Sequence, residues 1–96
     1  MISGWVCTPP ELRYSPAGIP VGQFALEHRS RQTEAGLPRE AYCRVGVVAS
    51  GEALRGKVES LALGSLVRVT GFLSRTRNRR GESRLVLHVI EIDLID

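Results

Sequence analysis

Aromatic residues and methionine are scarce in this chain of 96 residues, which has one Trp, two Tyr, two Phe and one Met. The interior of the fold must therefore be filled by Val, Leu, Ile and Ala, a composition that favours a compact β structure. A chain this short has room for one core and no second. We predict a single domain over residues 1–96.

The sequence also lacks a long apolar run and a signal peptide. A membrane helix needs roughly 20 apolar residues, and the start MISGWVC has no basic segment followed by a long apolar stretch. We therefore expect a cytoplasmic protein. Cys7 and Cys43 are the two cysteines, and without an export signal we expect both to be reduced core residues and predict no disulfide.

Lysine is nearly absent, because every basic residue except Lys57 is an arginine. The net charge is +3 and the pI is about 9.4, which suits an anionic partner such as nucleic acid or a membrane surface. Guanidinium groups stack on flat rings and bind phosphates in a forked geometry, although a genome rich in G and C would also favour arginine. The positive charge is concentrated in one segment, at Arg75, Arg77, Arg79, Arg80 and Arg84.

Alternating or continuous apolar patterns predict five strands. In the second strand Phe24, Leu26 and His28 share one face, and in the third Cys43, Val45 and Val47 do. The last strand is a long apolar run, which predicts burial on both sides, by the barrel and by a second element for which a partner subunit is a candidate. The predicted strands cover residues 2–7, 21–29, 41–50, 65–75 and 84–96.

Turn chemistry separates these strands. The two prolines after Thr8 end the first strand, and we expect a loop from there through SPAGIP. We also predict a flexible hairpin loop at 30–40 and an arginine-rich loop at 75–83.

The spacing of Leu54, Val58 and Leu61 predicts one or two turns of helix between the third and fourth strands. Gly71, inside the fourth strand, indicates a bulge or bend of the kind that closes small barrels. Five strands with one short helical element are the order expected of an OB-fold, a five-stranded Greek-key barrel. The predicted fold class is therefore all-β.

Several segments carry a family resemblance along the whole chain: SGWVC, SPAGIP, QFALEHRS, EAG followed by AYC, VASG, VTGFLS, LVLH and the closing LID. In order and spacing they resemble the family of primosomal replication protein N, PriB, dimeric relatives of the bacterial single-stranded DNA-binding proteins. The resemblance implies an OB-fold homodimer that binds single-stranded DNA. It also implies work with the restart helicase PriA and the loader protein DnaT at stalled replication forks.

The resemblance further implies which residues contact DNA. Tyr42 stands where the family carries a stacking tryptophan, and a base stacked on an aromatic ring contributes about 1 to 3 kcal/mol. Arginines neutralise phosphates without sequence preference. Arg75, Arg80 and Arg39 are additional basic candidates of this chain, and the positions that match basic positions of the family are Arg13, Arg29, Arg77, Arg79 and Arg84.

No arrangement of residues predicts catalysis. Glu27 and His28 are neighbours on a strand and point to opposite faces, while Cys43 and His88 lack the paired spacing of a zinc site. No phosphate-binding glycine loop is present. We therefore predict a non-catalytic protein with no metal and no cofactor, and we expect Trp5 to serve the rim of the core or the dimer contact.

One alternative from another class stays open. An OB barrel can hold protein partners, and the arginine loop could dock an acidic protein surface instead of DNA. In that case the chain would be a protein adaptor.

Overall fold

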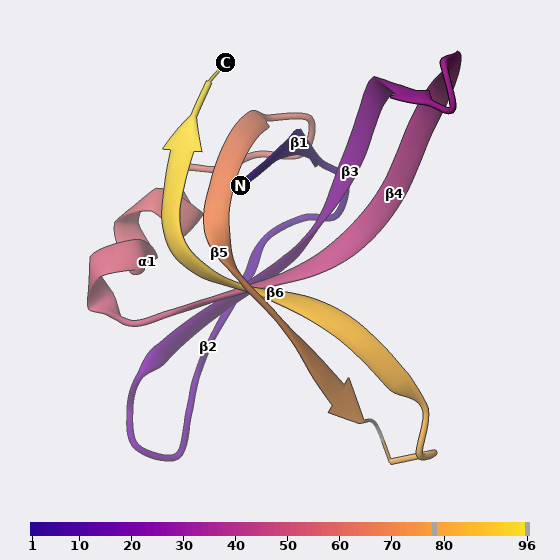
Figure 1. The fold of residues 1–96 in the computed structure, drawn as a ribbon. Coiled ribbons are helices and arrows are strands. Elements are labelled where there is room, and N and C mark those ends of the chain that lie inside the picture. Colours follow the sequence, from indigo (N-terminus) through magenta and orange to yellow (C-terminus); the bar gives the residue numbers. More distant parts are fainter. Residues whose placement is uncertain (78, 96) are drawn as a thin grey trace.

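The computed structural model describes residues 1–77 and 79–95. It contains six strands and one helix, and two long hairpins project from the barrel in different directions (Figure 1). The elements are β1 (Ile2–Val6), β2 (Glu11–Tyr14), β3 (Pro20–Glu34), β4 (Leu37–Ser50), α1 (Glu52–Glu59), β5 (Leu66–Arg77) and β6 (Ser83–Leu94).

Five of the strands close into a barrel. They are hydrogen-bonded in the order β1, β5, β6, β4, β3, and a pairing between β1 and β3 completes the circle. The pairing of β4 with β6 is parallel and the others are antiparallel. This is the Greek-key arrangement of an OB-fold, so the predicted five-stranded barrel is confirmed, with β2 added at the free edge of β3.

Alternation of side chains along the strands fills the barrel. Phe24 and Leu26 of β3 are 5% and 0% exposed, as predicted, and Val47 of β4 is 1% exposed. Burying each such side chain contributes about 1.5 to 3 kcal/mol. Val67 and Val69 of β5 are fully buried beside them, so the core consists mainly of aliphatic side chains.

The helix α1 covers one end of the barrel, where the sequence predicted a helical segment. Its Val58 is 2% exposed and packs so closely on β3 that a Cβ at Gly22 would lie 2.7 Å from its Cγ1 atom. The Nζ atom of Lys57 donates a hydrogen bond of 2.9 Å to the carbonyl oxygen of Ile92 in β6. The helix is thus held against both β3 and β6.

On its solvent side α1 is held by arginine contacts. The Arg55 guanidinium lies 2.9 Å from the Glu59 carboxylate and 5.6 Å from the centre of the Tyr14 ring. The hydrogen bond to Glu59, followed by the charge interaction with Tyr14, raises the pKa of Arg55. Within residues 1–77 and 79–95, no helix has the length and apolar character required to cross a membrane.

The predicted loop over residues 30–40 is wrong. β3 and β4 continue as a hairpin to a turn at Ala35 and Gly36, whose φ angles are 51° and 77°. Positive φ at both central residues is typical of two-residue hairpin turns. Most side chains of this segment are exposed, because it lies beyond the core, so no apolar alternation marks it as strand.

Two other connections are shorter than predicted. The loop predicted through SPAGIP contains β2, which pairs with β3 from Glu11↔Gln23 to Tyr14↔Pro20. The arginine-rich loop predicted at 75–83 is partly strand, because β5 extends to Arg77 and β6 begins at Ser83. These strand segments lie outside the core and carry mostly polar side chains, so the apolar pattern of the sequence does not identify them as strands.

The bulge predicted at Gly71 is present. The register of β5 against β6 shifts between Thr70 and Gly71, and a Cβ at Gly71 would overlap the carbonyl oxygen of His88. Only a residue without a side chain fits so close to the neighbouring backbone.

Burial differs from prediction at two places. Cys43 is exposed and Cys7 is partly exposed, both as free thiols, so Cys43 is not the core residue that was predicted. In β6, Leu85, Ile90 and Leu94 are 57%, 62% and 54% exposed. The middle of this strand is therefore buried within the chain, where Val86, Leu87 and Ile92 are 8%, 7% and 1% exposed, and apolar side chains nearer its ends are uncovered.

Candidate nucleic-acid interface

The barrel opens into a fork between β4 and β6. These strands pair at three positions only, Gly46↔Val86, Val47↔Leu87 and Val48↔His88. On the N-terminal side of Gly46, β4 pairs only with β3, and on the N-terminal side of Val86, β6 pairs only with β5, in each case to the end of the hairpin. The two hairpins diverge (Figure 1), and we call them the β3–β4 arm and the β5–β6 arm.

A cleft of about 730 Å³ lies at this fork on the outer face of the barrel. Ala25, Gly46 and Val86 are register partners across β3, β4 and β6 and form the floor of this outer cleft. Gly46, in the middle of this floor, has no side chain, and a Cβ added there would meet no other atom within 4 Å. The cleft is therefore open above its centre.

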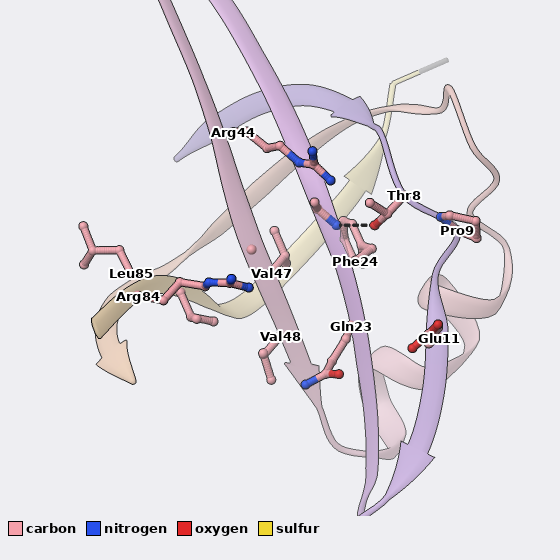
Figure 2. A pocket seen from close by; sticks show the side chains of 13 residues that line it. Thr8, Pro9, Glu11, Gln23, Phe24, Arg44, Val47, Val48, Arg84 and Leu85 are labelled. Atoms are coloured by element: carbon pink, nitrogen blue, oxygen red, sulfur yellow. Dashed lines mark hydrogen bonds between the residues drawn. The ribbon is translucent and has the colours of Figure 1, made fainter. Parts of the chain in front are cut away.

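Two arginines line the outer cleft. Arg44 precedes Gly46 by two positions on β4, and Arg84 precedes Val86 by two positions on β6, so strand alternation turns both toward the face of the floor. Figure 2 shows both side chains reaching into the cleft, while Leu85 points away. Both arginines are exposed, and the cleft carries their positive charge.

The loop after β1 forms the opposite wall of the outer cleft. The Thr8 hydroxyl accepts a 2.8 Å hydrogen bond from the Ala25 backbone N–H (Figure 2). Glu11 and Gln23, cross-strand partners of β2 and β3, line the same side. This wall offers polar side chains and the single carboxylate of Glu11, opposite the two arginines.

The ring of Tyr42 lies on the same face, on the β3–β4 arm. It is 56% exposed and follows the alternation of Arg44 and Gly46 on β4. Its register partner Arg29 holds a guanidinium carbon 5.2 Å from the ring centre, and the Nε atom of Arg29 lies 3.2 Å from a carboxylate oxygen of Glu27. The ring is thus displayed beside basic side chains.

Arg13 belongs to this face as well. It pairs with Val21, which has the same alternation as Gln23 and Ala25. Val21 and Arg29 are eight positions apart on β3, which corresponds to about 26 Å along the strand. The outer face therefore carries Arg13 at one end and Arg29 with Tyr42 at the other.

The remaining candidates lie elsewhere on the arms. Arg39 pairs with Gln32 and is out of phase with Tyr42, so it occupies the opposite face of the β3–β4 arm. Arg75 and Arg77 pair with Leu85 and Ser83 and are out of phase with Arg84. The predicted arginine cluster is thus divided between two faces.

At the end of the β5–β6 arm, Arg79 and Arg80 are exposed in the turn. They belong to neither face of the paired strands. The arginines of this arm surround it rather than forming a patch on one side.

Arg44 is a site residue that was not among the candidates predicted from the sequence. Strand alternation places it on the face of Tyr42, and its position two residues from that ring was the available signal. Its proximity to Arg84 depends on the pairing of β4 with β6, which joins segments 40 positions apart.

His28, one of the groups considered for catalysis, is held between two strands of the barrel by hydrogen bonds. The Nδ1 atom of His28 lies 2.6 Å from the Ser3 carbonyl oxygen and its Nε2 atom 3.0 Å from the Ser30 hydroxyl, which joins β3 to β1. Trp5 is 44% exposed on β1. In the part of the chain that the structure describes, no group of three or more His, Cys, Asp or Glu residues is placed to hold a metal ion.

On the opposite face of the fork lies a second cleft, of about 790 Å³. Apolar side chains dominate its lining, among them Val45, Leu73 and Leu87. Leu73 is 60% exposed. Arg44 and Arg84 border both clefts, and the second cleft differs from the outer one in its mainly apolar lining.

Comparison with known proteins identifies similar chains over the full length. A family model described as "Another single-strand binding protein family" matches residues 1–91. The Replication restart protein PriB of Photorhabdus laumondii is 51% identical over 96 residues, which cover 100% of this chain and 91% of that protein.

Solved structures have the same fold. PriB from Ralstonia solanacearum superimposes with a TM-score of 0.81 at 21% identity, covering 99% of this chain and 94% of the other. The Plasmodium falciparum SSB, solved in complex with ssDNA, gives a TM-score of 0.81 at 14% identity over 99% and 91%. At these identities both show the fold alone.

Proposed function

The chain belongs to this single-strand binding protein family, and on that premise we propose that it binds single-stranded DNA in the outer cleft as a non-catalytic protein of replication restart. Relatives of similar length carry the name Replication restart protein PriB. An SSB of the same fold has been solved with ssDNA. Both support the proposed ligand.

The observation that carries the proposal is the shared face of Tyr42, Arg44 and Arg84. Single-stranded DNA presents a row of phosphates and a series of exposed base faces. Arginines at the fork neutralise the phosphates and release counterions, while the exposed Tyr42 ring offers a surface for a base. Neither interaction depends on sequence, as a protein that acts at any stalled fork requires.

The open floor sets where the strand passes. A polynucleotide can approach the backbone of Gly46 closely, because no side chain rises there. From the outer cleft the strand continues toward Arg13 at one end and toward Arg29 and Tyr42 at the other. The basic side chains on the other faces and at the turn then bind phosphates as the strand leaves the cleft around the arms: Arg39, Arg75, Arg77, Arg79 and Arg80.

We further propose that the protein is a cytoplasmic homodimer that bridges DNA, the PriA helicase and DnaT. The family resemblance motivates the partners. For the dimer, the exposed apolar side chains along β6, Leu85, Ile90 and Leu94, are of the kind that subunits cover. Analytical ultracentrifugation at micromolar concentration should give twice the mass of 10.5 kDa, and sedimentation as a monomer would contradict this.

Replacing both Arg44 and Arg84 by Ala should weaken oligo-dT binding several-fold. The slope of log affinity against log salt should also become shallower by about 0.7 for each phosphate that is no longer neutralised. Fluorescence anisotropy over a salt series measures both quantities. The matched control is Arg68→Ala, since Arg68 is an exposed arginine that pairs with Ser3 and Asp93 on the β1–β5–β6 wall. Unchanged binding in the double variant would favour a protein adaptor whose arginines dock an acidic surface.

Replacing Gly46 by Leu tests the cleft without removing any charge. The new side chain has open space around it and should fill the floor, so oligo-dT binding should fall while the fold persists. Gly46→Ala is the control, because its small side chain leaves most of the floor open, and it should raise the free energy of unfolding by about 0.5 to 1 kcal/mol. Full affinity in the Leu variant, at unchanged stability in urea, would show that DNA does not cross Gly46.

A further inference from the structure

Phe72 and His88 form an aromatic pair to which the proposed DNA path assigns no role. They are register partners on β5 and β6, and their rings are stacked with centres 5.1 Å apart and planes 10° from parallel. Phe72 is 57% exposed and His88 is partly exposed. The pair therefore stands on the outer surface of the barrel and not in its core.

This pair adjoins the outer cleft. His88 follows Arg84 by four positions on β6, so both side chains share the outer face. The register partner of His88 on β4 is Val48, which lines the cleft. Val48 and Tyr42 are six positions apart on β4, or about 20 Å along the strand. The cleft thus has aromatic rings beyond both ends of its basic section.

The stacking fixes which ring surface is available. Phe72 on β5 covers one face of the imidazole of His88, since the two rings are nearly parallel. The opposite face is not covered by Phe72, and the strand on that side of β6 is β4, where Val48 is the register partner of His88. A flat group that lies over Val48 in the cleft would continue the stack.

We propose, on the basis of the DNA-binding function above, that His88 and Phe72 form a second base-stacking platform. A nucleobase over Val48 stacks on the face of His88 opposite Phe72, and Phe72 holds the imidazole in place from behind. Stacking accepts any base and requires one that is not already stacked in a duplex. Two platforms separated by the arginines of the fork therefore select an extended single strand.

His88→Ala should weaken binding to oligo-dT about fivefold, the lower end of the effect of removing one stacking aromatic. The salt slope should stay unchanged, because every arginine that neutralises a phosphate remains. His88→Phe should keep wild-type affinity, since a ring is still present. Fluorescence anisotropy with oligo-dT measures these effects, and thermal melting with sedimentation shows that each variant keeps the fold and the assembly of the wild type.

A matched abasic oligonucleotide provides the decisive comparison. It retains the phosphates and lacks bases, so His88→Ala and the wild type should bind it equally. Three results would overturn the proposal. The first is equal affinity of His88→Ala and the wild type for oligo-dT, and the second is a decrease in the affinity of His88→Ala for the abasic strand that is as large as for oligo-dT. The third is weaker binding by His88→Phe together with a shallower salt slope, which would mean that His88 binds a phosphate. If Arg44→Ala with Arg84→Ala still weakens binding, the DNA-binding function stands and this platform alone is rejected.

Discussion

The short parallel pairing of β4 with β6 is the constraint on which the candidate site depends. Three residue pairs join β4 to β6, and the same pairs fix the phase of the two strands relative to each other. Arg44 and Arg84 consequently face the outer cleft together. A slip of one residue in either strand would turn its arginine to the opposite face, where Val45 and Leu87 line an apolar cleft. Since the strands separate directly beyond these pairs, the fork itself is also a product of the short pairing.

The two faces of the fork suit two different kinds of binding partner. The outer face carries guanidinium groups and exposed rings, which suit an anionic polymer with flat bases. The other face exposes Leu73 and Leu85, which suit a protein surface. Both sets of side chains come from the same strands, because alternation sends neighbouring residues to opposite sides. A chain of 96 residues can thereby present two kinds of surface from one barrel.

The sequence predicted the parts of the fold that surround the core. Alternation identified Phe24 and Leu26 as buried, the spacing of Leu54 and Val58 located the helix, and Gly71 marked the bulge. The extension of β3 and β4 through 30–40 could not be predicted in this way, because strands that are exposed to solvent on both faces show no apolar alternation.

For the site, the sequence supplied the exposed Tyr42 and a rich set of arginines, but not their division between faces. That division follows from the registers of β4 with β3 and of β5 with β6. The meeting of Arg44 with Arg84 follows from a contact between distant segments. Such a contact is a property of the closed barrel and leaves no local pattern in either strand.

Photo-crosslinking with oligonucleotides that contain 5-iododeoxyuridine tests the proposed outer-face DNA path most directly, because it identifies the aromatic ring that lies against a bound base. We predict that the crosslinked peptide carries the modification on Tyr42, on the outer face. Tyr14 is also an exposed aromatic, at 54%, but it is out of phase with Arg13 on β2 and lies against Arg55 of α1, away from the outer cleft. Crosslinks at Tyr14, with none at Tyr42, would contradict this path.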